Sequence, residues 1–257
     1  MTTGYDLYLL DLPERLRPHL QKHREAWDRY ESLRDLAHDD PDRRAAWDAC
    51  EAMPDPRYFG LSISGIASVR AAMGAAGMLA SDMLASGESQ IEFPDWRHVP
   101  PEKLDGTPFH PDCYYPAEVC TPEQIAYMDA LDGVRRYRPE GNSGIQTWKL
   151  RSNDYWIVNA DECAEALQAW ASVEPERRHA IIESVVAEDI AESGSGWIEA
   201  MGNICGSDGD DPRDVRLEPL VVTPCGRYPT VAAFVAVWFD WLAFLRLGAE
   251  GDGFMVE

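Results

Sequence analysis

Positive charge is scarce in this sequence. Its 257 residues include 23 Lys and Arg against 45 Asp and Glu, which gives a formal net charge of -22 at pH 7. The excess is even along the chain, since residues 1–130 carry 23 acidic and 12 basic groups and residues 131–257 carry 22 and 11. Phosphate backbones repel such a surface, so we expect no direct binding of DNA or RNA.

Closely paired cysteines are also missing. The chain has six cysteines, and none of them belongs to a Cys-x-x-Cys pair of the kind that binds zinc or forms a redox centre. The first residues lack the basic region and the apolar run of an export signal. We therefore expect a cytoplasmic protein with reduced thiols.

Long apolar runs and familiar catalytic motifs are absent. The longest apolar stretch, Val231 to Leu245, is interrupted by Asp240 and is shorter than the roughly 20 residues that a membrane span needs. The sequence contains no nucleophile elbow, phosphate-binding loop, dinucleotide fingerprint or zinc-protease helix. We expect no membrane span and no cofactor, and no motif assigns a catalytic residue.

Apolar periodicity predicts an α+β fold that is mainly helical, with short strands and a central hairpin. We expect one domain over residues 1–257. The alternative is two lobes, a helical lobe with a long loop at 1–135 and a hairpin with helices at 145–257. The predicted strands lie at residues 5–10, 58–61 and 254–256, and the predicted helices begin at Pro18, Arg43, Ser62 or Ser64, Asn159, Pro175 and Thr230.

Two of these helices have the clearest apolar faces. In the last one, Phe234, Trp238, Trp241, Leu242 and Leu245 recur at helical spacing, which is typical of a core helix. In the first one, the residues at helical spacing are Leu16, Leu20, Trp27 and Tyr30. His23 lies on the same face, where we expect a hydrogen-bonded histidine in the core or at its boundary.

The segment 145–158 reads as two strands joined by a turn at 152–154. Aromatic and hydrogen-bonding side chains alternate there, a mixture that is typical of protein and ligand contacts. The alternative is that the aromatic side chains pack inward on a sheet. The predicted binding residues are Trp148, Lys149, Arg151, Asn153, Asp154, Tyr155 and Trp156.

Three other places carry groups that could do chemistry. The long loop at 86–123 is the first of them, and its metal-capable side chains are His98, His110, Cys113 and Cys120, without a convincing fourth ligand at a familiar spacing. His179, Glu183, Glu188, Asp189 and Glu192 share the helix at 175–192, where a solvated face explains them as well as a metal or acid–base site. The acidic tract 208–214 departs from the pattern of a calcium loop.

A resemblance adds a functional expectation. The segment from Trp148 to Trp156, the following Asp161-Glu162-Cys163 and the C-terminal Trp238-x-x-Trp241 pattern resemble uncharacterised actinobacterial proteins, some of which are suspected immunity proteins. The likeness covers about the last 110 residues of the chain. It implies an immunity protein. Together with the negative charge, it leads us to expect a protein-interaction module of immunity or regulatory type, whose negative field steers a basic partner protein and whose aromatic hairpin or long loop supplies the anchor. The alternative is a small metal-dependent enzyme or ligand-binding protein that uses the 98–120 loop.

Overall fold

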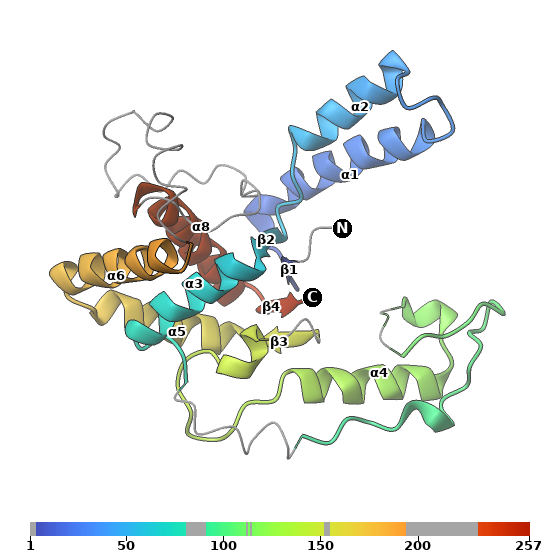
Figure 1. Ribbon diagram of the computed structural model, residues 1–257. Helices are drawn as coiled ribbons and strands as arrows, with labels where there is room; N and C mark the ends of the chain where they lie inside the picture. The colour runs from blue at the N-terminus through green and yellow to red at the C-terminus, as the bar shows by residue number, and fades with distance from the viewer. Residues whose placement is uncertain (1–3, 81–90, 112, 114, 152–154, 194–230) are drawn as a thin grey trace.

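A computed structural model describes residues 4–80, 91–111, 113, 115–151, 155–193 and 231–257. Four strands form one antiparallel sheet in the order β2-β1-β4-β3 (Figure 1). These are β1 (Gly4–Leu9), β2 (Tyr58–Ser62), β3 (Trp156–Val158) and β4 (Phe254–Val256). The described chain is otherwise mainly helical, so the predicted α+β class is confirmed.

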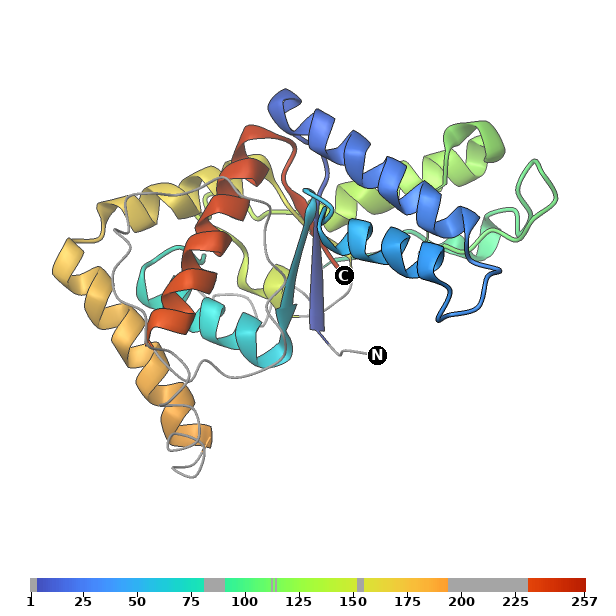
Figure 2. The ribbon, with the colours of Figure 1, turned by 90° about the horizontal axis from the view of Figure 1, so that it is seen from above.

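Helices cover one face of this sheet. They are α3 (Ile63–Ala75), α5 (Ala160–Ser172), α6 (Pro175–Ser193) and α8 (Val231–Glu250), which lie together on one side of β1 and β2 in Figure 2. Helix α5 packs along α8, and α6 contacts both α3 and α8. The main core therefore lies between this helical layer and the sheet.

Helix α8 supplies the centre of the core, as its sequence pattern predicts. Its side chains Phe234, Trp238, Trp241, Phe244 and Leu245 are essentially inaccessible to solvent. The ring of Phe244 lies 5.3 Å from that of Phe59 in β2 and 5.0 Å from that of Phe254 in β4, measured between centroids. Aromatic contacts of this kind contribute about 0.5–1.5 kcal/mol each beyond the area that they bury. By length and composition α8 could also cross a membrane, but half of its apolar window is buried inside the protein.

A glycine turn brings the chain from α8 into β4. Gly253 has a φ of +87°, in the region that glycine enters without strain. A Cβ at this position would lie 2.0 Å from the carbonyl oxygen of Val158, so any side chain would force β4 away from β3. The predicted strand at 254–256 is confirmed, and it pairs with β1 on one side and β3 on the other.

The predicted central hairpin is wrong. Residues Thr147–Leu150 form a short 3-10 helix, η5, instead of a strand, and β3 pairs with β4 from the end of the chain. In this turn the side chain of Lys149 points inward and donates to the carboxylate of Glu162 in α5. An alternating pattern shows that side chains are partly buried, but not which strand will pair with them.

Two parts of the chain project on the other side of the sheet (Figures 1 and 2). One is the helical hairpin of α1 (Arg17–Ser32) and α2 (Pro41–Glu51), which follows the short helix η1 (Glu14–Leu16). The other contains α4 (Pro122–Arg135), a helix that the sequence analysis did not predict. Among the described residues between α3 and α4, the helices are the short η3 (Trp96–His98) and η4 (Ala117–Val119). We call residues 91–135 the acidic arm, because they contain nine Asp and Glu and three Lys and Arg.

The acidic arm has a small core of its own. Phe109, Tyr127 and Leu131 are buried against one another. Gln124 is completely buried, and its side-chain amide donates to the carbonyl oxygens of Pro100 at 2.7 Å and of Glu102 at 3.0 Å. These bonds fasten the loop to α4, so the predicted long loop is ordered where the structure describes it.

Candidate protein-interaction surface

The predicted binding segment is largely buried. Trp148, Lys149 and Trp156 retain at most 4% of their accessible surface. Arg151 is exposed and Tyr155 is half-buried, whereas Asn153 and Asp154 lie outside the described residues. Three of the seven predicted side chains are therefore held in the interior, as expected if the aromatic residues pack inward.

Lys149 takes part in a buried ion pair. Its Nζ donates to Oε2 of Glu162 at 2.6 Å, and both side chains are inaccessible to solvent. The backbone N–H of Asn159 donates to the same oxygen at 2.9 Å, within a capping box at the beginning of α5, and the N–H of Gln146 donates to Oε1 at 3.2 Å. Burial lowers the pKa of Lys149, and the carboxylate of Glu162 opposes that shift. The pair fastens the loop before β3 to the beginning of α5.

Arg135 and three aromatic side chains pack together around the beginning of β3, and among them Arg135 and Trp156 are buried. Tyr155 has a φ of +59°, and the guanidinium of Arg135 lies 5.0 Å from the centroid of its ring. The exposed ring of Phe93 covers Trp156, with centroids 5.7 Å apart. A positive φ is uncommon for a bulky residue, and the Tyr155 ring lies against Arg135, the last residue of the acidic arm.

The metal-capable side chains of the loop are not brought together. His98, His110 and Cys113 are exposed, whereas Cys120 is buried. His98 lies 3.7 Å from Asp95, on an exposed part of the arm. Within the described ranges, no three His, Cys, Asp or Glu side chains are close enough to hold a metal ion together.

His179, Glu183 and Glu188 lie on the solvent side of α6. Nε2 of His179 is 3.0 Å from Oε1 of Glu183, and both side chains are more than half exposed. Glu188 is exposed too. The side chains of Asp189 and Glu192 and the acidic tract 208–214 fall outside the described residues.

The hairpin of α1 and α2 has almost no support from the main core. In these two helices, which the structure describes in full, the buried residues are Ala26, Ala46 and Cys50. They are small, so the two helices can approach one another closely. The helices pack mainly against each other and, through α1, against η1. Most of the hairpin surface is thus available to another molecule.

An aromatic face runs along this hairpin, and we define it by Trp27, Tyr30 and Trp47. The Tyr30 ring lies between the other two, with centroid distances of 5.7 Å to Trp27 and 5.2 Å to Trp47. The guanidinium of Arg43 lies 5.8 Å from the centre of the Tyr30 ring. Trp27 and Trp47 remain 44% and 42% exposed, although the sequence pattern predicts that Trp27 and Tyr30 belong to a buried face.

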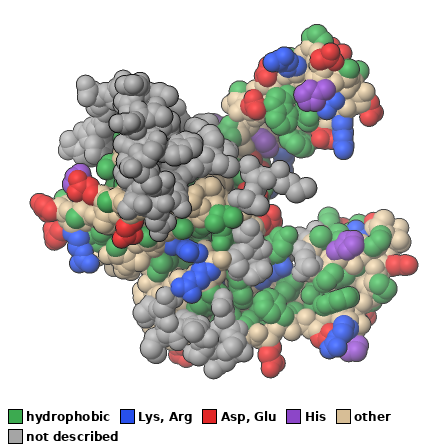
Figure 3. Space-filling view, in the orientation of Figure 1, with side chains coloured by type: hydrophobic (Ala, Val, Ile, Leu, Met, Phe, Trp, Pro, Cys, Tyr) green, Lys and Arg blue, Asp and Glu red, His purple; other side chains and the backbone are tan. Residues whose placement is uncertain are grey.

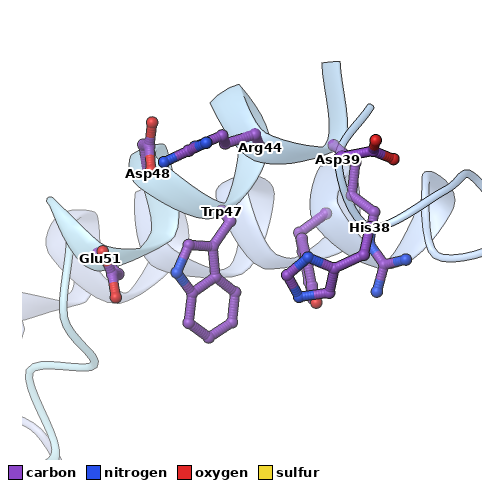
Figure 4. A pocket seen from close by; sticks show the side chains of 8 residues that line it. His38, Asp39, Arg44, Trp47, Asp48 and Glu51 are labelled. Atoms are coloured by element: carbon purple, nitrogen blue, oxygen red, sulfur yellow. The ribbon is translucent and has the colours of Figure 1, made fainter. Parts of the chain in front are cut away.

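A concavity of about 510 Å³ lies beside the aromatic face. Figure 4 shows Trp47 and His38 pointing in the same direction, with Glu51 at one end, while Arg44 lies beside Asp48 on the rim. Trp, Tyr and Arg are the residues enriched among those that dominate the binding energy of protein interfaces, whereas Asp and Glu are more typical of the polar rim. No simple sequence motif marks this surface, because its residues come from two helices.

Polar contacts fix the base of the hairpin. Nδ1 of His23 lies 2.7 Å from the carbonyl oxygen of Met53, which satisfies this histidine as predicted. Asp55 accepts from the guanidinium of Arg57 at 2.7 Å. Burial raises the pKa of Asp55, but the hydrogen bonds from Arg57 outweigh this effect and the pKa lies below its ordinary value. The hairpin is therefore fixed at its base and free along its aromatic face.

Comparison of the chain with protein-family models, with curated protein sequences and with solved structures found no significant match.

Proposed function

We propose that this protein is a protein-interaction module of immunity or regulatory type that binds a basic partner protein through the aromatic face of the α1–α2 hairpin. The observation that carries the proposal is the exposure of Trp27 and Trp47 on a helix pair with three buried residues. An exposed tryptophan leaves a large apolar surface in contact with water, which is unfavourable. A partner that buries this surface gains the corresponding hydrophobic free energy.

The shape of the hairpin favours a protein partner over a small molecule. Small-molecule sites are concave and enclose most of their ligand. The concavity that Tyr30 and Trp47 help to line is only partly enclosed, and the row of rings continues beyond it to Trp27, which is not among its lining residues. An apolar centre with a charged rim is the usual arrangement of a protein–protein interface.

The charge of the chain favours a basic partner. A net charge of -22 attracts positively charged proteins over a range of about 8–10 Å at physiological ionic strength. Such attraction mainly raises the association rate, whereas the buried anchors determine how slowly the complex dissociates. We therefore assign steering to the overall charge and anchoring to the aromatic face.

The test is a pull-down from the native host with the tagged full chain and with the double variant Trp27→Ala/Trp47→Ala. We expect the wild-type chain to retain a basic protein that the double variant loses. For the purified pair, removal of two anchor residues of about 2 kcal/mol each predicts a loss of affinity of several hundred-fold. Added salt should slow association and leave dissociation nearly unchanged.

Trp96→Ala is the matched control, because Trp96 is 55% exposed but lies in the acidic arm. This variant should retain the partner as wild type does. Equal retention by the wild-type chain and the double variant would overturn the proposal, as would loss of the partner on Trp96→Ala alone. Recovery of an acidic partner would overturn the inference that the partner is basic.

A further inference from the structure

The face of the sheet that the helices leave uncovered carries its own set of side chains. Side chains alternate along a strand, so Asp6 and Tyr8 of β1 point away from the buried Leu7 and Leu9. The register places Tyr58 of β2 opposite Tyr8, and Met255 of β4 opposite Tyr8 on the other side. Glu257 follows β4 and exchanges two backbone hydrogen bonds with Asp6, of 2.9 and 2.7 Å. We call Asp6, Tyr8, Tyr58, Met255 and Glu257 the sheet floor.

The two tyrosines are oriented by neighbouring groups. The Tyr58 hydroxyl donates to Oδ1 of Asp6 at 2.6 Å, and its ring lies 5.3 Å from that of Tyr8. Gly60 makes room for this arrangement, since a Cβ there would lie 2.4 Å from the Tyr58 hydroxyl. The floor is thus a fixed pair of rings beside a carboxylate that already accepts one hydrogen bond.

Negative charge is concentrated on the sheet floor. Asp6 and Glu257 are directly opposite each other on neighbouring strands, an arrangement in which like charges repel. Burial raises the pKa of Glu257, and the charge of Asp6 raises it further, while Arg135 partly offsets both effects. Burial, Asp6 and Glu257 also raise the pKa of Tyr8. A cation placed here would relieve this repulsion.

The surroundings of the sheet floor leave room for a chain segment. Figure 3 shows the molecule hollowed between the α1–α2 hairpin and the acidic arm, on the side of the sheet away from α3 and α8. The acidic arm, whose sequence has nine Asp and Glu against three Lys and Arg, borders this hollow. The space beside the sheet floor is therefore bordered by the two projecting parts of the chain.

We propose that the sheet floor binds arginine side chains of the basic partner, a proposal that rests on the proposed function. A guanidinium forms two parallel hydrogen bonds with a carboxylate and stacks on an aromatic ring at the same time, and Asp6 beside Tyr8 and Tyr58 offers both contacts. Lysine makes the charge contact without the planar stack. The floor thus selects arginine over lysine, while the hairpin supplies the apolar anchor.

The test measures binding of a tetra-arginine peptide to the full chain by isothermal titration calorimetry, with tetra-lysine and tetra-glutamate peptides for comparison. We expect binding in the order arginine, lysine, glutamate. The double variant Asp6→Asn/Glu257→Gln should weaken tetra-arginine binding by about tenfold or more, since one hydrogen bond to a charged group contributes about 1.5–3 kcal/mol. Tyr58→Phe, which removes only the hydroxyl that positions Asp6, should weaken it less.

The matched control is Glu183→Gln/Glu188→Gln, which removes the same charge from exposed positions of α6. Equal weakening by both double variants would show general attraction to a negative protein and would overturn the proposal, as would absence of tetra-arginine binding. Trp27→Ala/Trp47→Ala should leave tetra-arginine binding unchanged. Failure of the sheet-floor proposal is therefore distinguishable from failure of the hairpin proposal, which the partner pull-down tests separately.

Discussion

Replacement of Lys149 by methionine tests how the segment before β3 is held. Methionine keeps most of the length of the side chain and removes its charge, so the carboxylate of Glu162 stays buried with no cation beside it. Breaking a buried ion pair by removal of one partner costs about 3–5 kcal/mol. The three N–H donors that remain, from Gln146 and from the backbone and side chain of Asn159, place the expected cost near the lower end, at about 3 kcal/mol.

Glu162→Gln makes the converse change. It leaves the ammonium group of Lys149 buried beside a neutral amide, and we expect a cost of about 3–5 kcal/mol. In the double variant Lys149→Met/Glu162→Gln no buried charge is left unpaired, so its cost should fall short of the sum of the single costs by about 2 kcal/mol or more.

Urea unfolding followed by tryptophan fluorescence and far-UV circular dichroism measures these costs. Coincident transitions by the two probes would justify two-state values. Costs of about 3 kcal/mol are a large part of the roughly 5–15 kcal/mol that stabilises a typical domain. The reasoning fails if Lys149→Met costs less than about 1 kcal/mol, or if the two single costs add in the double variant.

Two further predictions concern single positions. Burial raises the pKa of Asp240 in α8, so the ionised carboxylate destabilises the folded chain at about pH 7, and stability is lost as the pH rises through the folded-state pKa. Asp240→Asn should therefore raise the melting temperature at about pH 7 and raise it less at about pH 5. Absence of a gain at either pH would contradict the prediction. Gly144 has a φ of +85°, and a Cβ added there would lie 2.5 Å from the carbonyl oxygen of Met78. Gly144→Ala should therefore lower the free energy of unfolding in urea by about 2 kcal/mol. Gly133→Ala, at an open position in α4, should instead raise it by about 0.5–1 kcal/mol.

Local signals in the sequence predict the helices around the main core. The spacing of Phe234, Trp238 and Trp241 marks α8, because a buried helix must place large side chains on one face at every turn. Asn159 and Glu162 mark the beginning of α5 by the hydrogen bonds that a helix terminus needs. Signals of this kind depend on residues within a few positions of one another, so they predict a helix independently of contacts with distant parts of the chain.

Distant contacts determine the parts that the sequence does not predict. Strand β3 finds its partner in β4 at the far end of the chain, and no local pattern specifies that pairing. The buried face of helix α4 includes the polar residues Gln124 and Arg135, so the spacing of apolar residues does not reveal this helix. Each of these polar side chains becomes acceptable in the interior only through tertiary contacts, such as the carbonyl oxygens that receive the Gln124 amide.

The aromatic face illustrates the same limit for the candidate site. The helical spacing of Leu16, Leu20, Trp27 and Tyr30 predicts one apolar face, and the chain divides it in two. Leu16 and Leu20 pack against the main core, whereas Trp27 and Tyr30 continue past it along the hairpin. An amphipathic pattern predicts that one helix face will be buried, but not whether the same chain or a partner molecule buries it.

This division makes the proposed function separable from folding. Because the α1–α2 hairpin contributes three small residues to the interior and packs mainly against itself, truncation of Trp27 and Trp47 removes little that stabilises the sheet or α8. The double variant should therefore unfold in urea within about 1 kcal/mol of the wild-type chain, the usual range for substitutions at exposed positions. If it instead loses several kcal/mol, the two rings support the fold, and loss of the partner would no longer identify them as binding anchors.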